Sequence, residues 1–102
     1  MSRSKLNRGD YLVRKAIKQL GIEGFRCEKS KKIRWAQQDF WGLWDILAIK
    51  PDNLRMIQVS QKYFSQKPKE FQEAALRFPV VSDMTKEYWR PKNDGTWDIK
   101  YL

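Results

Sequence analysis

Two short apolar runs joined by a turn constrain the fold of this chain more than any other feature. The first run, "LWDILAI" (residues 43–49), is continuous and of strand length, which is typical of a strand buried on both faces of a sheet. "KPDN" (residues 50–53) has the residue types of a turn, and "LRMIQVSQ" (residues 54–61) is again largely apolar. We therefore expect a β-hairpin at the centre of the fold.

Helical and strand patterns surround this hairpin. Residues 1–20 space Leu6, Val13, Ile17 and Leu20 as one buried helical stripe, and Gly21 can end that helix. A second helix is predicted over residues 68–79, with a proline at each end. These two patterns predict helices before and after the central hairpin.

The remaining strands are predicted on either side. "FRCEKSKK" (residues 25–32) has the pattern of an edge strand, and residues 33–42 are expected to form an aromatic-rich loop. Residues 86–102 alternate around "NDG", which predicts a closing hairpin. The expected fold is a single α/β domain over residues 1–102, with a mixed central sheet flanked by helices in the order α-β-β-β-α-β-β.

The composition excludes several kinds of chemistry. The 102 residues include no histidine and a single cysteine, Cys27. Serine–histidine and cysteine–histidine nucleophile systems, histidine-ligated metals and an internal disulfide are therefore closed to this chain. Any catalysis needs carboxylates, lysine or amide side chains, together with a hard cation such as Mg²⁺ or Mn²⁺ that prefers oxygen ligands.

The N-terminal segment and the apolar runs indicate whether the chain is secreted or inserted in a membrane. No apolar stretch follows Met1 as a secretory signal would, and Asp45 interrupts the longest apolar run, residues 40–49. That run is also too short to cross a bilayer. We expect a soluble cytoplasmic protein with no membrane partner.

Positive charge is concentrated in the first third of the chain. Residues 1–34 contain eleven Lys or Arg and three acids, so they hold +8 of the net charge of +9. One-sided basic charge is typical of a protein that binds a polyanion, and we expect nucleic acid, DNA ahead of RNA. The alternative is charge that serves solubility alone. The candidate nucleic-acid-binding residues are Arg3, Lys5, Arg8, Lys29, Lys31, Lys32 and Arg34.

Aromatic residues accompany these basic residues. Trp35, Phe40 and Trp41 follow Lys31 and Lys32 in the expected loop, and such a mixture can stack bases and bind phosphates. Alternatively, the rings cover the sheet as part of the core. We favour this second interpretation for Trp41.

Polar side chains interrupt both apolar runs. Asp45 begins the first predicted strand, and pairing within the hairpin can bring it near Gln58. Alternation along a strand directs Gln58, Ser60 and Lys62 to one face. Asp10 falls on the apolar stripe of the first helix and can reach the same region.

We therefore predict a site in which Asp10, Asp45 and Gln58 hold a Mg²⁺ or Mn²⁺ ion, since two carboxylates and an amide oxygen suit such a cation. Simpler interpretations stay open for two of these residues. Asp10 could cap the helix or pair with Arg8, Arg14 or a strand residue, and Gln58 could bridge backbone groups.

At these residues the chain resembles the PD-(D/E)xK nuclease superfamily, and within it the small Holliday-junction-resolvase-like nucleases. The resemblance extends from "KLNRGDYLVRKAIKQLG" (residues 5–21) through the closing hairpin. It implies a restriction-endonuclease-like core in which Asp10 and Asp45 bind metal. In the (D/E)xK element this chain has "IQVS" (residues 57–60), so that Gln58 replaces the acid and Ser60 replaces the lysine.

The resemblance implies a Mg²⁺-dependent DNA endonuclease of the Holliday-junction-resolvase-like type, acting as a homodimer because two nicks need two sites. The expected catalytic residues are Asp10, Asp45, Gln58 and Lys62, where Lys62 is the candidate to replace the motif lysine. The alternative is a catalytically lapsed nuclease-fold module that binds nucleic acid or a larger assembly without cleaving it. A third possibility is a basic structural protein with no site.

Overall fold

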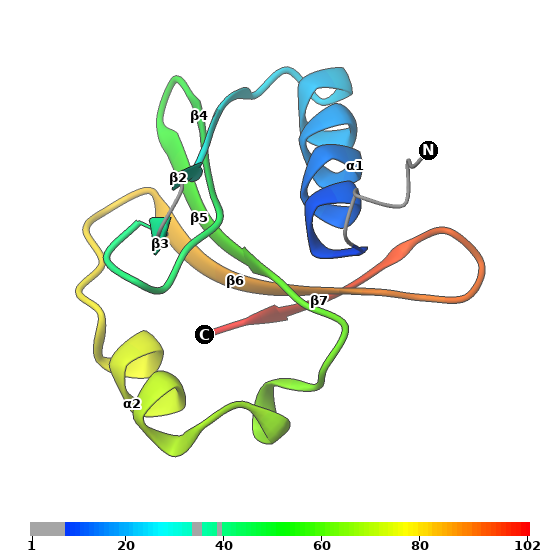
Figure 1. The fold of residues 1–102 in the computed structure, drawn as a ribbon. Coiled ribbons are helices and arrows are strands. Elements are labelled where there is room, and N and C mark those ends of the chain that lie inside the picture. Colours follow the sequence, from blue (N-terminus) through cyan, green and yellow to red (C-terminus); the bar gives the residue numbers. More distant parts are fainter. Residues whose placement is uncertain (1–7, 34–35, 39) are drawn as a thin grey trace.

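A computed structural model describes residues 8–33, 36–38 and 40–102 (Figure 1). Its main sheet has five strands in the spatial order β1-β4-β5-β6-β7. Helix α1 (Arg8–Ile22) packs on one face of this sheet and helix α2 (Lys69–Arg77) on the other. Along the chain, the helices and the five main-sheet strands follow the order α-β-β-β-α-β-β, so the predicted α/β class and element order are confirmed.

The predicted central hairpin is present. Strand β4 (Ile46–Lys50) pairs antiparallel with β5 (Asn53–Val59), and Ile46 lies opposite Ile57. Strand β1 (Arg26–Lys29) pairs with the other side of β4 and forms one edge of the sheet, as predicted. Strand β4 is therefore interior, which explains its continuous apolar sequence.

A parallel pair joins the hairpin to the C-terminal strands. Strand β5 runs parallel to β6 (Met84–Pro91), and the connection passes through the 3-10 helix η2 (Phe64–Gln66) and α2. Strand β7 (Trp97–Tyr101) closes the sheet antiparallel to β6, which confirms the predicted C-terminal hairpin. The turn between them includes Gly95 at φ +88°, a conformation that glycine adopts readily.

The buried stripe of α1 differs from the predicted one. Leu12, Ala16 and Leu20 are at most 1% exposed, whereas the predicted Val13 and Ile17 are only partly buried. These three residues are spaced four apart, and the small Ala16 side chain suits a close approach of the helix to the sheet. The helix also continues to Ile22 instead of ending at Gly21. Leu6 lies outside the described residues.

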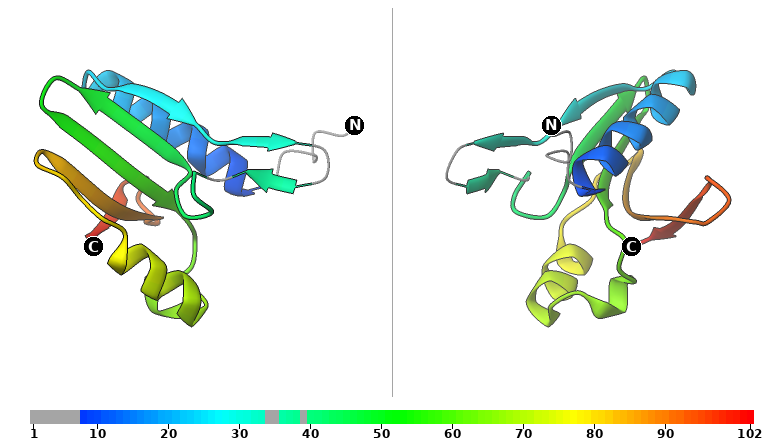
Figure 2. Two further views of the ribbon diagram at one scale, coloured as in Figure 1. Left: turned by 90° about the vertical axis from the view of Figure 1, so that its left-hand side faces the viewer. Right: turned by 45° about the vertical axis from the view of Figure 1, so that its right-hand side comes forward.

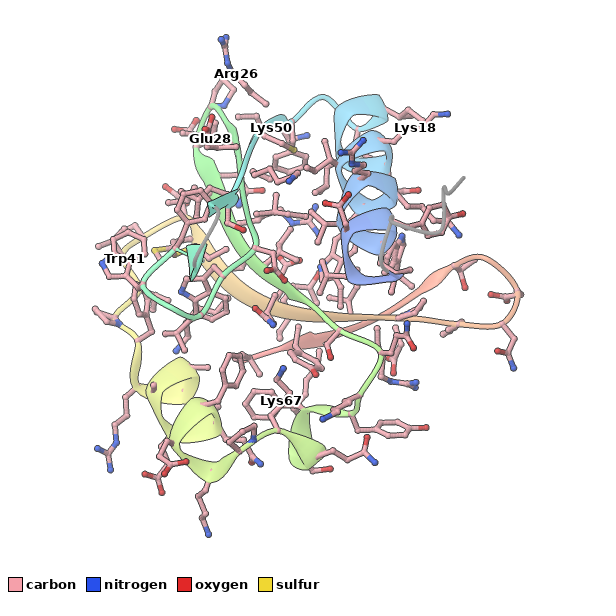
Figure 3. All side chains as sticks on the ribbon, viewed as in Figure 1. Lys18, Arg26, Glu28, Trp41, Lys50 and Lys67 are labelled. Atoms are coloured by element: carbon pink, nitrogen blue, oxygen red, sulfur yellow. The ribbon has the colours of Figure 1, made fainter. Side chains whose placement is uncertain are left out.

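The expected loop over residues 33–42 is partly a second, small sheet. Strands β2 (Lys31–Ile33) and β3 (Ala36–Gln38) pair antiparallel and project beyond the end of the main sheet (Figure 2). Trp44 is fully buried, but Trp41 is 68% exposed and lies at the periphery of the molecule (Figure 3). The prediction that Trp41 belongs to the core is wrong: its backbone turns at φ +54°, and its largely exposed ring packs edge-to-face with Phe78.

Candidate functional site

Asp45 lies between two strands at the start of β4. Its backbone N–H donates to the carbonyl of Ile57 at 2.8 Å, and its carbonyl accepts from Ser30 at 2.9 Å. The Oδ2 atom of its side chain accepts a hydrogen bond of 2.9 Å from the backbone N–H of Val59. The residue is 9% exposed. Ile57 and Ser30 therefore hold the backbone of Asp45, and Val59 fixes its buried carboxylate.

Gln58 lies on β5 between Ile57 and Val59, and both of these residues hydrogen-bond to Asp45. The regular β4–β5 ladder ends where Ile46 lies opposite Ile57, and the Asp45 N–H also bonds to Ile57, so the ladder register does not extend to Asp45. Gln58 is 8% exposed, and its buried Oε1 atom has no hydrogen-bond partner among the described residues. An unpaired buried carbonyl costs free energy unless something binds it. The structure thus brings together two of the three predicted metal ligands.

Tyr88 borders this pair on the next strand. In the parallel register it lies beside Gln58, and its hydroxyl donates to the backbone carbonyl of Lys62 at 2.8 Å. Burial raises the pKa of Tyr88, and the charge of Asp45 raises it further. A hydrogen bond with the Ser60 side chain and the charge of Arg90 both lower this pKa. The Tyr88 hydroxyl therefore lies where the charges of Asp45 and Arg90 both act.

The predicted position of Lys62 is wrong in one respect. Strand β5 ends at Val59, and the chain bends at residues 61–62, so strand alternation does not extend to Lys62. The Ser60 hydroxyl accepts a hydrogen bond of 3.2 Å from the Lys62 backbone N–H, which is a turn typical of serine. Lys62 is exposed next to the site and no longer shares a strand face with Gln58.

Asp10 approaches the same end of β4 from the opposite face of the sheet. Its Oδ2 atom lies 3.0 Å from Arg14 Nε, and its Oδ1 atom lies 3.6 Å from Lys29 Nζ. Lys29 pairs with Ile46, the residue after Asp45. The alternative interpretation of Asp10 as a partner of Arg14 thus describes a contact that is present. No group of three or more acidic or cysteine side chains gathers as a metal site within the described residues.

Of the predicted nucleic-acid-binding residues, the structure describes few. Arg3, Lys5 and Arg34 lie outside the described residues, and only the backbone of Arg8, Lys31 and Lys32 is described. Lys29 contacts Asp10, while its side chain stays 37% exposed. The predicted basic surface therefore stays a prediction.

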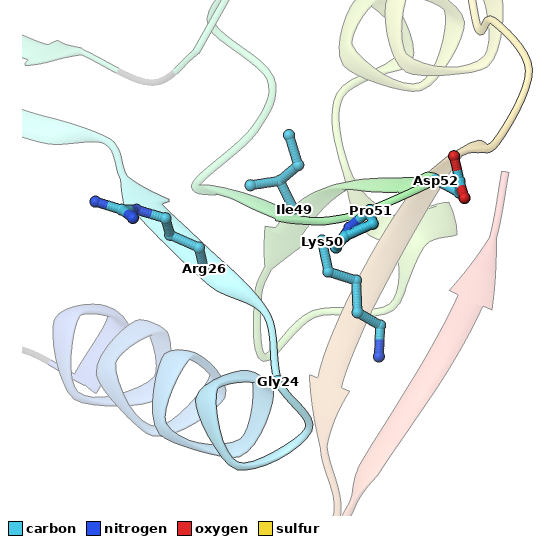
Figure 4. A pocket seen from close by; sticks show the side chains of 6 residues that line it. All are labelled: Gly24, Arg26, Ile49, Lys50, Pro51 and Asp52. Atoms are coloured by element: carbon cyan, nitrogen blue, oxygen red, sulfur yellow. The ribbon is translucent and has the colours of Figure 1, made fainter.

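An open hollow lies at the other end of β4, away from Asp45 (Figure 4). Arg26 and Lys50 supply its positive charges, and the hollow includes the exposed turn of the β4–β5 hairpin. Its remaining lining residues are Gly24, Ile49, Pro51 and Asp52. Because β4 separates it from Asp45 and Gln58, this hollow is not part of the candidate site.

Tyr88 and Arg90 were not predicted as site residues. Alternation within "KEYWRPK" (residues 86–92) could have placed both on one face, but their proximity to Gln58 depends on the parallel register between β5 and β6. No sequence pattern gives that register across the long connection.

The chain was compared with family models, curated proteins and solved structures. No family model, curated protein or solved structure matches this chain. Among the described residues, no helix has both the length and the apolar character needed to cross a membrane. Function is therefore inferred from the site residues.

Proposed function

We propose that this chain is a DNA-binding domain of the PD-(D/E)xK type that hydrolyses phosphodiester bonds with a divalent cation. The observation that carries this proposal is the placement of Asp45 against Ile57 and Val59, the two neighbours of Gln58, where the buried Gln58 Oε1 has no partner among the described residues. The α-β-β-β-α-β-β order and the central parallel pair support it. The high positive charge of the chain suits a polyanionic substrate.

The residues present fit a Mg²⁺ or Mn²⁺ ion. Mg²⁺ commonly binds one or two carboxylates and completes its shell with waters and substrate phosphates. Asp45 would supply the charged ligand and Gln58 a neutral oxygen. Asp10, the third predicted ligand, lies on the other face of the sheet and contacts Arg14 and Lys29, so it is not part of the proposed cation site. A bound cation of this kind polarises a phosphodiester and lowers the pKa of water. The neutral Gln58 predicts weaker cation affinity than an acid would give.

The protein's own contribution is to hold these groups rigidly. Hydrogen bonds to Ile57, Ser30 and Val59 fix Asp45, so little reorganisation is needed when a phosphate binds. In the reaction, a water oxygen adds to phosphorus as the bond to one sugar oxygen breaks, and that oxygen takes up a proton. We infer branched DNA as the substrate and a homodimer as the active species from the resemblance to junction resolvases.

Cleavage of an immobile four-way DNA junction in the presence of Mn²⁺ or Mg²⁺ tests this function. Asp45→Asn should abolish cleavage while DNA binding is retained, because only the charged ligand is lost. Asp52→Asn is the matched control: Asp52 is exposed in the β4–β5 turn at φ +65°, a conformation that asparagine also tolerates. If wild-type protein cleaves and Asp45→Asn cleaves equally well, the proposed site is wrong.

A second candidate function has an observation of its own. Ser60 stands where the motif has lysine, and the strand ends before Lys62, so β5 presents no ammonium beside Gln58. This arrangement favours a lapsed nuclease fold that binds DNA without cleaving it. Binding of the junction without cleavage in either metal would support this candidate and contradict the enzyme.

A further inference from the structure

Arg90 on β6 lies beside the position that lacks the motif lysine. The Ser60 backbone N–H donates to the carbonyl of Trp89 at 3.0 Å, so the parallel register brings Arg90 next to Ser60. Alternation along β6 directs Arg90 to the same face as Tyr88, which lies beside Gln58. Arg90 is therefore the strand-borne cation next to Ser60 in the described part of the site.

The Arg90 side chain is held by two neighbours but can still bind a further group. Its guanidinium lies 3.8 Å from the centre of the exposed Tyr63 ring, and its Nη2 atom lies 3.3 Å from Asp98 Oδ2. The Arg90 side chain is 21% exposed, and that of Asp98 is 51% exposed, so water weakens this ion pair. A stacked guanidinium retains free N–H groups at its edge and can bind phosphate through two of them.

Electrostatics links Arg90 to the rest of the site. Its charge and that of Asp45 both act on the hydroxyl of Tyr88. A phosphate bound at Asp45 and Gln58 would therefore lie within the field of Arg90.

We propose that Arg90, held against Tyr63, contacts the DNA phosphate at the Asp45–Gln58 site and supplies the positive charge that Ser60 lacks. This inference rests on the proposed function and names the residue that carries the missing charge. Arg90 comes from the neighbouring parallel strand, and it takes the role predicted for Lys62. Tyr63 is a positioning residue, since its ring orients the guanidinium.

Salt-dependent DNA binding tests the contact without requiring cleavage. In the Asp45→Asn background, binding of the four-way junction is measured over a range of salt concentrations. Arg90→Gln should weaken binding about tenfold, as expected for the loss of a charge-assisted hydrogen bond, and reduce the slope of log K against log salt by about 1. Arg90→Lys should restore most of the slope. Arg77→Gln, at the exposed end of α2, is the matched arginine control and should leave both values unchanged.

Asp98→Asn separates phosphate binding from a structural role. If Arg90 only stabilises the β6–β7 pair, then Asp98→Asn should weaken DNA binding as Arg90→Gln does. If Arg90 binds phosphate, then Asp98→Asn should leave binding unchanged or strengthen it, because it removes a competing carboxylate. In the cleaving wild-type background, Arg90→Gln should also lower the cleavage rate at saturating DNA.

The outcomes distinguish this inference from the proposed function. If the protein binds DNA but Arg90→Gln keeps the salt slope, or if Asp98→Asn weakens binding equally, the role of Arg90 is overturned and the proposed function stands. If wild-type protein neither binds nor cleaves any DNA probe, the proposed function fails and the role of Arg90 fails with it. Thermal unfolding of each variant shows whether the fold is intact.

Discussion

Arg55 on β5 and Glu87 on β6 bind each other through two hydrogen bonds, of 2.9 and 2.8 Å, across the parallel pair of strands. Glu87 is 1% exposed, and its carboxylate also accepts hydrogen bonds from Thr85 and from Trp89 Nε1. The guanidinium lies over the rings of Phe25 and Trp89. The α1 side of the core thus contains a buried Arg55–Glu87 ion pair, and the carboxylate oxygens of Glu87 are hydrogen-bonded to residues on β5 and β6.

Removing Glu87 should therefore destabilise the protein strongly. Glu87→Ala leaves the Arg55 charge, with an 11% exposed side chain, without its main partner, and breaking such a pair costs about 3–5 kcal/mol. Chemical denaturation measures the free energy of unfolding. Glu73→Ala on the exposed face of α2 is the control and should change stability by less than about 0.5 kcal/mol. Equal effects of the two substitutions would contradict this account.

Lys86 should stabilise the C-terminal end of α2. Its Nζ atom donates to the carbonyls of Ala75, Leu76 and Phe78 at 2.8, 2.7 and 2.9 Å, which are groups that a helix end leaves unpaired. Lys86→Met keeps the length of the side chain and removes these hydrogen bonds. The free energy of unfolding should therefore fall by about 2–3 kcal/mol. Hydrogen exchange should show α2 losing protection more than α1. Uniform loss over both helices would argue against a local role.

Tyr88 should titrate at higher pH than an ordinary tyrosine. Burial raises its pKa first, and the charges of Asp45 and Arg90 act on it in opposite directions. Asp45→Asn should therefore lower the pKa of Tyr88, and Arg90→Gln should raise it. NMR of ¹³C-labelled tyrosine measures these shifts, and Tyr88→Phe assigns the signal.

The same shift affects stability at alkaline pH. Because the folded-state pKa of Tyr88 is raised, its contribution is fully present below the unfolded-state value of about 10 and is lost as pH rises through the folded-state value. Tyr88→Phe should remove this part of the pH dependence of unfolding. An unchanged alkaline slope in Tyr88→Phe would show that other groups cause it.

Cys27 should react slowly with thiol reagents. It is the single cysteine of the chain and packs against the α1 side of the core. Burial raises the pKa of its thiol, while the nearby Arg55 charge partly opposes that shift. Since the thiolate is the reactive form, labelling by a disulfide reagent near pH 8 should be slower than for free cysteine. Labelling in denaturant provides the control, and equal rates in the folded and denatured protein would contradict the burial.

The sequence was sufficient for the elements with strong local patterns. The apolar run of β4, the turn after it and the alternation around Gly95 each depend on neighbouring residues, and each element forms where predicted. The proximity of Asp45 to Gln58 also follows locally, because the hairpin brings Asp45 against Ile57 and Val59 on either side of Gln58.

The sequence was insufficient where long-range packing decides. Which of the α1 side chains are fully buried depends on how the helix approaches the sheet, so Leu12 and Ala16 replaced the predicted Val13 and Ile17. Lys62 lost its strand position because the Ser60 hydroxyl binds the backbone after β5 has ended. Arg90 lies beside Ser60 because of the parallel register between β5 and β6, which the sequence does not define.

The central parallel pair also sets the order in which this protein can fold. Leu54 pairs with Met84, and Gln58 with Tyr88, thirty positions further along the chain. The β4–β5 and β6–β7 hairpins close short loops and can form within microseconds, but joining them requires the whole crossover through α2 to close. The rate-limiting barrier should therefore coincide with the docking of two preformed hairpins, and the candidate site, which is built from both, should appear only after that barrier is crossed.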